Sequence, residues 1–353
     1  MSLYIVPITK LRKQEITSSE INYKFHEPYC WFHYFISEAI KSNSKYILFQ
    51  EEQEREFGGM NSDYWTDYFI ELNKRLIEND ITLVIAFSGY PKESIYSWQE
   101  KYLNIKVYNT PLYFLNFLYY LDKQIIEDLS QKIKNVKFEK LFITLNNKPH
   151  PSRCSLIDYL CKYNLLNLGT YSWLKDGEVN YKFDCFDNEY KKLNYTQKNS
   201  GRDYYWKDLL YGNPLINLVT ESDDSKIGIS EKTCKPLLIG QPFIVYSQKG
   251  FHKVLQEFGF ELYDEIFDYS FDLLDSPKDR MKGICDNLNN LKDKDLSELY
   301  KSISHKLEKN KQTALNIIKE RKFIDKEYLE LLINNKEQFQ DEISTFNFFN
   351  LDN

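Results

Sequence analysis

An arginine near the start of an expected helix is the first residue whose position suggests chemistry. In NNKPHPSRCSLIDYL (146–160), a strand is expected to end at Asn146, and two prolines and Ser152 then open a helix. Arg153 falls in the first turn, where a positive charge opposes the helix dipole. A phosphate would compensate, because a guanidinium holds two oxygens while helix N–H groups hold others. The alternative is an arginine folded back onto a surface carboxylate.

The five histidines add one further candidate. His150 lies in the same loop and could donate to a phosphate oxygen. His26 and His33 are expected to be packed or half-exposed, and His252 and His305 to lie at the surface. There is no H-x-x-x-H, no P-loop glycine pattern and no G-x-S-x-G, which argues against zinc hydrolases, P-loop kinases and α/β-hydrolases. No metal site is expected.

A second charged group precedes an apolar strand in ISEKTCKPLLIGQPFIV (229–245). A strand is expected to end at Glu221 and Ser222, and a helix to begin at Ser230, followed by Glu231 and Lys232. A glutamate at a helix start is an ordinary capping residue. A lysine in the same turn is less ordinary. Together they suit a nucleotide-sugar, because carboxylates accept from hydroxyls while a lysine and helix amides neutralise a diphosphate leaving group.

These stretches carry a resemblance to a known family. The run LVTES…ISEKTCKPLLIGQPFIV resembles the donor-binding signature of family 10 fucosyltransferases and of related, uncharacterised viral and bacterial glycosyltransferases. LFITLNNKPHPSRCSLIDYLCKYNLLNLGTYSW is similar to the Asn-Arg-x-x-Arg-x-x-Arg segment that precedes that signature in those relatives. The resemblance spans about residues 140–268. Gly228 stands where fucosyltransferases usually carry an aromatic residue, so the base and sugar of the donor stay open.

The resemblance implies a GT-B fold in which the second domain binds a GDP- or UDP-linked sugar and the first binds the acceptor. Arg153 and Lys232 would neutralise the diphosphate, and Glu231 would hold the nucleotide ribose. Glu221 and Ser222 would line the donor pocket. The reaction would be transfer of a sugar, fucose by closest analogy, to a hydroxyl such as that of a glycan, with inversion and without a metal or other cofactor.

An inverting transferase needs a general base to deprotonate the acceptor hydroxyl. The resemblance to family 10 fucosyltransferases implies that this base lies in the first domain, where FQEEQEREFGG offers Glu51, Glu52 and Glu54 at a strand end. Glu52 is the first choice and Asp63 the next. The alternative for each carboxylate is an ordinary solvated residue at a helix start.

The elements that must position these residues alternate along the chain. In the first half, apolar strand-like runs at 3–8, 45–50, 81–88 and 105–109 alternate with helix-like stretches at 29–42, 61–79, 92–103 and 112–133. In the second half, strands at 140–146, 215–221 and 242–247 alternate with helices at 151–166, 230–240 and 250–260. Residues 174–213 are expected to form an elaborated loop. Such alternation is typical of parallel sheets, whose ligands bind beyond the carboxyl ends of the strands.

We therefore predict an α/β protein of two doubly wound, Rossmann-like domains facing a cleft. The acceptor domain is expected over 1–135, the nucleotide-sugar domain over 136–275, and a helical extension over 276–353. That extension has apolar residues at helical spacing without sustained heptads, so helices lying against the domains are favoured over a coiled-coil arm.

Composition limits the classes of function. The 353 residues are 42% hydrophobic and carry a net charge of −6. The protein is therefore not expected to have the overall positive potential that attracts the phosphate backbone of nucleic acids. No apolar run approaches the ~20 residues that span a bilayer, and the N-terminus lacks a secretory signal, which together favour the cytoplasm. The six cysteines show no C-x-x-C pair and are expected to be reduced core thiols.

Two further functions stay open at this point. The acceptor could be a hydroxymethylated base of viral DNA, which would require a basic strip beside the cleft and a flipped nucleotide. Alternatively, the chain could be a binding or scaffold protein that keeps the fold without catalysis, with its charged helical tail as the partner surface.

Overall fold

The chain forms two compact units, each with its own parallel sheet. The structure is a computed structural model and describes residues 3–5, 32–51, 63–87, 101–109, 123–146, 149–174, 180–193, 210–221, 229–320 and 325–335. The first unit comprises Met1–Leu115 with Arg321–Asn353, and the second comprises Asn116–Glu320. The chain therefore passes between the units twice.

The first unit contains a parallel sheet whose described strands follow chain order. They are β1 (Leu3–Ile5), β2 (Tyr46–Glu51), β3 (Thr82–Phe87) and β4 (Ile105–Asn109), in the order β1-β2-β3-β4. Helices α2 (Phe32–Lys41) and α3 (Asp63–Glu78) pack against each other and against these strands. Because the order of the described strands does not reverse, these strands do not create the crevice at which doubly wound sheets bind ligands.

The end of the chain returns to this first sheet. Helix α13 (Lys326–Asn334) is capped by Asp325, whose side chain accepts from the N–H groups of Glu327 and Tyr328. The Tyr328 ring stacks on Tyr108 of β4 with centroids 5.3 Å apart, and Glu327 pairs with Lys106. The expected C-terminal extension is thus divided, since α13 belongs to the first unit and its preceding helices to the second.

The second unit contains a parallel sheet whose strand order reverses. Its strands are β5 (Lys140–Asn146), β6 (Gly169–Trp173), β7 (Pro214–Thr220) and β8 (Phe243–Tyr246), in the order β6-β5-β7-β8. The chain leaves β5 toward one edge and leaves β7 toward the other. The carboxyl ends of β5 and β7 therefore flank a topological switch point, which is the usual ligand position in such sheets.

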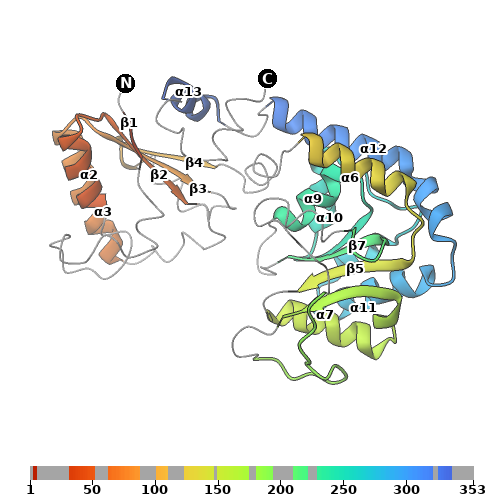
Figure 1. The fold of residues 1–353 in the computed structure, drawn as a ribbon. Helices are drawn as coiled ribbons and strands as arrows, with labels where there is room; N and C mark the ends of the chain where they lie inside the picture. The colour runs from red at the N-terminus through yellow and green to blue at the C-terminus, as the bar shows by residue number, and fades with distance from the viewer. Residues whose placement is uncertain are drawn as a thin grey trace. The chain divides into compact units, whose positions relative to one another are not determined.

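Helices cover both faces of this sheet (Figure 1). Helices α7 (Pro151–Lys162) and α11 (Pro277–Leu291) pack together on one face, while α9 (Glu231–Ile239) packs with α6 (Lys123–Asn135) and α12 (Leu296–Glu320) on the other. The short helix α10 (Phe251–Glu257) follows β8. The central strand β7 is accordingly buried along its whole length, at all seven residues.

Most elements of this unit lie where the sequence indicates them, with two differences. Strand β6 had no predicted counterpart, because GTYSW opens on glycine and lacks an apolar run. Helix α6, which we placed in the first domain, packs on α9 in the second unit. Its buried face consists of Ile126, Ser130 and Ile133.

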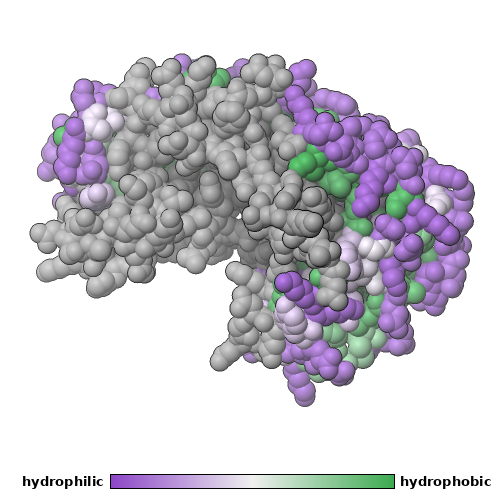
Figure 2. Space-filling view, viewed as in Figure 1, coloured by the Kyte–Doolittle hydropathy of each residue, from purple (hydrophilic) through white to green (hydrophobic). Residues whose placement is uncertain are grey.

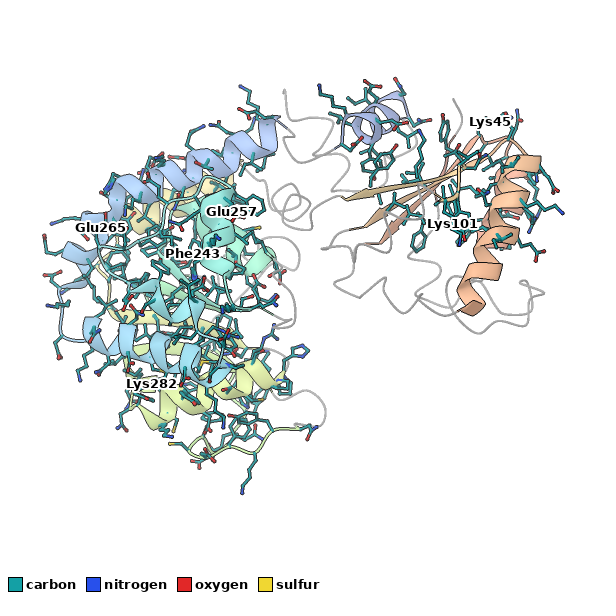
Figure 3. The ribbon with its side chains drawn as sticks, turned by 180° about the vertical axis from the view of Figure 1, so that it is seen from behind. Lys45, Lys101, Phe243, Glu257, Glu265 and Lys282 are labelled. Atoms are coloured by element: carbon teal, nitrogen blue, oxygen red, sulfur yellow. The ribbon has the colours of Figure 1, made fainter. Side chains whose placement is uncertain are left out.

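In the second unit, apolar side chains point into the interior and charged side chains lie at the surface, as in other globular folds. Phe243 points into the interior, where its ring meets Tyr263 edge-on at 5.6 Å, whereas Glu265 and Lys282 lie at the periphery (Figure 3). Hydrophilic residues cover much of the coloured surface along α12 (Figure 2). Among the described residues, no helix combines the length and apolar character needed to cross a membrane.

Candidate anion-binding site

Two helix N-termini meet the carboxyl edge of the second sheet at the switch point. Helix α7 follows β5 and helix α9 follows β7, and β5 and β7 are neighbours. Each helix runs antiparallel to its strand and lies on the opposite face from the other. Their N-terminal turns, which carry Arg153 and Lys232, are therefore brought to the same edge although 79 positions apart in sequence.

Glu221, directly after β7, ties the strand end to the start of α9. Its side chain is 3% exposed. Its Oε1 accepts from the Ser230 N–H at 3.1 Å and the Thr233 hydroxyl at 2.7 Å, and its Oε2 accepts from the Ser230 hydroxyl. Both carboxylate oxygens are thus engaged within the protein. These bonds give Glu221 a positioning role, and its place in the donor pocket stays a prediction.

Ser230 is the N-cap of α9. Its hydroxyl oxygen accepts from the Lys232 N–H at 3.2 Å, and its own N–H is bound by Glu221. In a capping box, a glutamate three residues into the helix would bind that N–H. Here Thr233 occupies that position, and the strand-end glutamate takes over the function. The start of α9 is therefore fixed to the end of β7.

Lys232 points back into this network from the first turn of α9. Its Nζ lies 3.0 Å from the Ser230 hydroxyl, 3.0 Å from Glu231 Oε1 and 3.8 Å from Glu221 Oε2, and its side chain is 24% exposed. Burial lowers the pKa of Lys232, but the Glu221 and Glu231 carboxylates outweigh burial and the pKa is raised overall. The lysine is a partly accessible, permanent cation at neutral pH.

Arg153 approaches the same point from α7. The residue is only 6% exposed, so it does not lie at the surface. Its positive charge is close enough to act against the charge of Lys232, whose pKa it lowers. Buried cations are stabilised by negative groups beside them, and Glu221 and Glu231 provide such groups for Lys232. The topology therefore places the helix turns that carry Arg153 and Lys232 at the same sheet edge, within the range at which the two charges interact.

Lys235, one helical turn after Lys232, adds a third cation that sequence reasoning missed. It is 6% exposed, and its charge helps to lower the pKa of Glu231. Three cationic side chains, Arg153, Lys232 and Lys235, thus share this region with the carboxylates of Glu221 and Glu231. Cations therefore gather at the N-terminal turns of α7 and α9, where the helix dipoles also favour an anion. The helical spacing from Lys232 could have indicated Lys235.

Buried oxygens mark the same edge of the sheet. Asn146 Oδ1, Thr220 Oγ1 and Ser247 Oγ are buried and accept or donate no hydrogen bond within the described parts of the chain. Asn146 and Thr220 end β5 and β7, and the pairing of Ile143 with Asn217, continued along both strands, sets them side by side. Buried polar atoms are almost always hydrogen-bonded, so such a group is typical of a site completed by water or a ligand.

Glu231 and His150 complete the predicted donor-binding residues that the structure describes. The Glu231 side chain is 33% exposed. Burial would raise its pKa, but Lys232 and then Lys235 reverse this and the pKa is lowered, so Glu231 is a carboxylate at neutral pH. His150 is half-buried and is itself the N-cap of α7, without a side-chain capping bond. Ser152, expected as that cap, lies inside the first turn and is buried.

Several predicted site residues lie outside the parts of the chain that the structure describes. Glu52, Glu54, Ser222 and Gly228 are not among the described residues. Asp63 is the first residue of α3, and Glu51 the last of β2. The choice of general base therefore stays a prediction.

Two expectations about histidine and cysteine are corrected. His252 is 2% exposed rather than at the surface, because its Nδ1 pairs with buried Asp272 at 2.9 Å and its Nε2 accepts from the Val245 N–H at 3.4 Å. Cys185 is exposed and Cys161 half-buried, so not all cysteines are core thiols. In the described ranges, no group of three or more His, Cys, Asp or Glu residues could hold a metal ion.

Comparisons of the chain with protein-family models, with curated proteins and with solved structures found no match.

Proposed function

We propose that the chain is a glycosyltransferase of GT-B-like organisation that takes its sugar from a nucleoside diphosphate donor. The observation that carries the proposal is that the first turns of α7 and α9, which carry Arg153 and Lys232, meet the same edge of one sheet at its switch point. A diphosphate fits this arrangement because it offers anionic oxygens to both cations and to the N-terminal turns of α7 and α9.

In the proposed reaction, the acceptor hydroxyl attacks the anomeric carbon of the donor sugar. The bond between that carbon and the phosphate oxygen breaks, and a nucleoside diphosphate leaves. Negative charge grows on the leaving oxygen, where Arg153 and Lys232 stabilise it more than in the ground state. A carboxylate of the first unit takes the acceptor proton, and Glu52 is our first choice. Attack from the face opposite the leaving group inverts the anomeric centre.

The remaining residues have supporting roles in this proposal. Glu231 is ionised and one-third exposed, so it can accept from ribose hydroxyls. Glu221 holds the start of α9, and with it Lys232, in a fixed position. Asn146 and Thr220 offer buried polar atoms to the bound donor. Because cationic side chains carry the leaving-group charge, the proposed transfer needs no divalent metal.

The experiment that tests this function is a donor screen with the full chain. GDP-fucose, GDP-mannose, UDP-glucose and UDP-N-acetylglucosamine are each incubated with the protein, with and without a mixture of glycan acceptors. Release of GDP or UDP is measured together with the thermal midpoint. We expect one donor to raise the midpoint and to be hydrolysed slowly without acceptor. A protein that neither binds nor turns over any of these donors would favour the scaffold alternative.

Chelation gives a second, independent readout of the mechanism. If Arg153 and Lys232 supply the leaving-group stabilisation, millimolar EDTA should leave the transfer rate unchanged. A rate that falls with EDTA and returns with Mg²⁺ or Mn²⁺ would contradict the metal-independent mechanism while leaving the donor assignment intact.

A further inference from the structure

Two cysteines of the second unit lie in direct contact. Cys161 is in the last turn of α7 and Cys185 lies in the segment 180–193, and their sulfur atoms are 2.8 Å apart. Cys185 is exposed and Cys161 is half-buried, whereas the other described cysteines, Cys154, Cys234 and Cys285, are buried. These two thiols are therefore distinguished both by their contact and by their access to solvent.

A buried carboxylate holds the backbone of Cys185 in this position. Asp158, which is 4% exposed, accepts from the N–H groups of Asp184 at 2.9 Å, Cys185 at 2.7 Å and Phe186 at 2.9 Å. Asp158 precedes Cys161 by three residues on α7, so both side chains project from the same face of the helix. The helix that carries one thiol thus also fixes the chain that carries the other.

The same segment is attached to the edge strand β6. Trp173 and Lys191 exchange two backbone hydrogen bonds of 2.7 Å, and the Trp173 Nε1 donates to Asn188 Oδ1 at 2.8 Å. The rings of Phe183 and Phe186 meet the Trp173 ring edge-on. Contacts on both sides of Cys185 therefore restrict its motion relative to α7.

We propose that Cys161 and Cys185 form a reversible disulfide that links α7 to the segment 180–193. A disulfide bond is about 2.05 Å long, so the sulfurs need to approach by only about 0.8 Å, within reach of small side-chain rotations. The backbone attachments through Asp158 keep the two chains in place while the sulfurs move. This inference does not depend on the proposed nucleotide-sugar site.

Oxidised glutathione is a sufficient two-electron oxidant for this step. The Cys185 thiolate attacks one sulfur of oxidised glutathione, which forms a mixed disulfide and releases one glutathione thiolate. Cys161, once deprotonated, attacks the Cys185 sulfur and releases the second glutathione. The two thiol protons pass to the two glutathione products. Cys185 attacks first because it is exposed, and because burial, with the bond to Cys185, raises the pKa of Cys161 to about 11.

The test is disulfide mapping on the folded full chain. The protein is equilibrated in mixtures of reduced and oxidised glutathione, quenched with N-ethylmaleimide, digested and analysed by mass spectrometry. We expect a linked pair of peptides containing Cys161 and Cys185, lighter by two hydrogens than the reduced pair. Cys154, Cys234 and Cys285 serve as internal controls and should stay unlinked.

Stability provides the second readout. Cross-linking residues 24 positions apart should raise the thermal midpoint of the oxidised protein by about 5–10 °C. Cys185→Ser, at an exposed position, should fold normally and lose both the link and this rise, and Cys161→Ala should do the same. Glutathione retained on Cys185 of the wild type, or a link that forms only in urea, would overturn the proposal.

Discussion

The Thr233 hydroxyl donates to Glu221 Oε1 at 2.7 Å, which joins the first turn of α9 to the end of β7. With the Ser230 N–H on the same oxygen, this bond makes Glu221 a fixed anchor for the start of α9. A carboxylate so placed sets the position of α9 and therefore of Lys232. The donor site proposed above depends on this anchor for its geometry.

Replacing the anchor should destabilise the second unit. In Glu221→Gln the amide cannot accept at both oxygens, so a buried donor loses its partner and Lys232 loses one neighbouring carboxylate. We expect a loss of about 2–4 kcal/mol in the free energy of unfolding, measured by urea denaturation. Glu257→Gln, at an exposed position of α10, should change the same quantity by less than about 0.5 kcal/mol. Equal effects of the two variants would refute the anchoring role.

Replacing Lys232 should lower the rate of sugar transfer more than it lowers the stability of the fold. If its ammonium neutralises the leaving diphosphate, Lys232→Ala should lower kcat/KM by a factor equivalent to about 2–4 kcal/mol of transition-state stabilisation. Lys253→Ala removes the same charge from an exposed position on α10 and should leave kcat/KM unchanged. An unchanged kcat for Lys232→Ala at saturating donor would show that Lys232 does not act on the leaving group.

The charge of Glu231 should show in the pH dependence of stability. Its folded pKa is lowered because Lys232 and Lys235 outweigh burial, so its ionised form is favoured by folding. The stability it contributes is complete above its unfolded pKa of about 4.3 and is lost as pH falls through the lower folded value. The difference in unfolding free energy between wild type and Glu231→Gln should therefore be constant from pH 6 to 8 and shrink below about pH 4.5. A difference that grows on acidification would contradict this sign.

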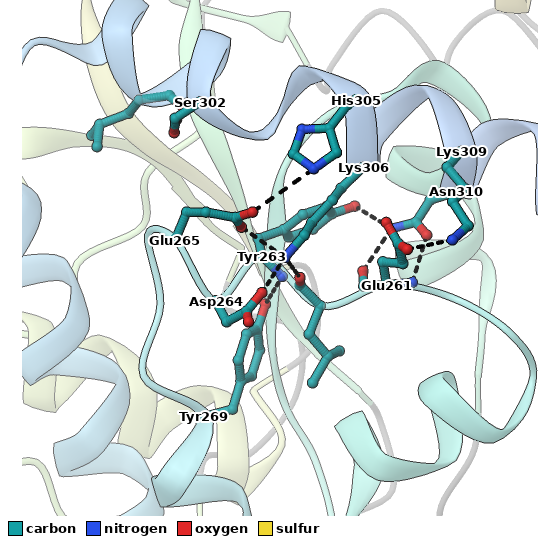
Figure 4. Close-up of polar contacts among 12 residues, drawn as sticks. Glu261, Tyr263, Asp264, Glu265, Tyr269, Ser302, His305, Lys306, Lys309 and Asn310 are labelled. Atoms are coloured by element: carbon teal, nitrogen blue, oxygen red, sulfur yellow. Dashed lines mark hydrogen bonds and ion pairs between the residues drawn. The ribbon is translucent and has the colours of Figure 1, made fainter.

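Asn310 of α12 is hydrogen-bonded to Glu261 and Tyr263 of the segment 260–269, and we call this group the polar clamp (Figure 4). We expect Asn310 to contribute most of the stability that the clamp provides. Asn310, 1% exposed, accepts from the Glu261 N–H at 2.7 Å and donates to the Glu261 carbonyl at 2.8 Å and to the Tyr263 hydroxyl at 3.2 Å. Asn310→Ala leaves these buried groups unpaired and should cost about 2–3 kcal/mol.

The neighbouring ion pair provides the matched control for this clamp. Lys309, on the same helix, pairs with Glu261 but has a side chain that is 59% exposed, so solvent screens the interaction. Lys309→Ala should therefore cost less than about 1 kcal/mol in the same urea experiment. A larger loss for Lys309→Ala than for Asn310→Ala would contradict this account of the clamp.

The placement of Arg153 and Lys232 at one sheet edge could be predicted from sequence because each follows a strong local signal. Apolar runs identify β5 and β7, and the residues that follow each strand can then be placed at one sheet edge. The function of Glu221 could not be predicted in this way. Its partners Ser230 and Thr233 lie 9 and 12 residues further on, and only the fold shows that they use both of its oxygens.

Burial was the second property that the sequence could not supply. His252 was expected at the surface, but it is buried against Asp272, which lies 20 residues away on a short 3-10 helix. Cys161 and Cys185 are likewise brought together by Asp158, through bonds to backbone N–H groups that have no sequence signal. Contacts of this kind depend on tertiary packing rather than on local periodicity.

The most direct test of the central claim is calorimetric titration of GDP and UDP into wild type, Arg153→Ala, Lys232→Ala and the double variant. If both cations hold one diphosphate, the preferred nucleotide should bind wild type at least tenfold more tightly than its monophosphate. Each single variant should weaken that binding by about 1.5–3 kcal/mol, as expected for a hydrogen bond to a charged group. Wild-type protein that binds neither diphosphate, or a double variant that binds as tightly as wild type, would contradict the account.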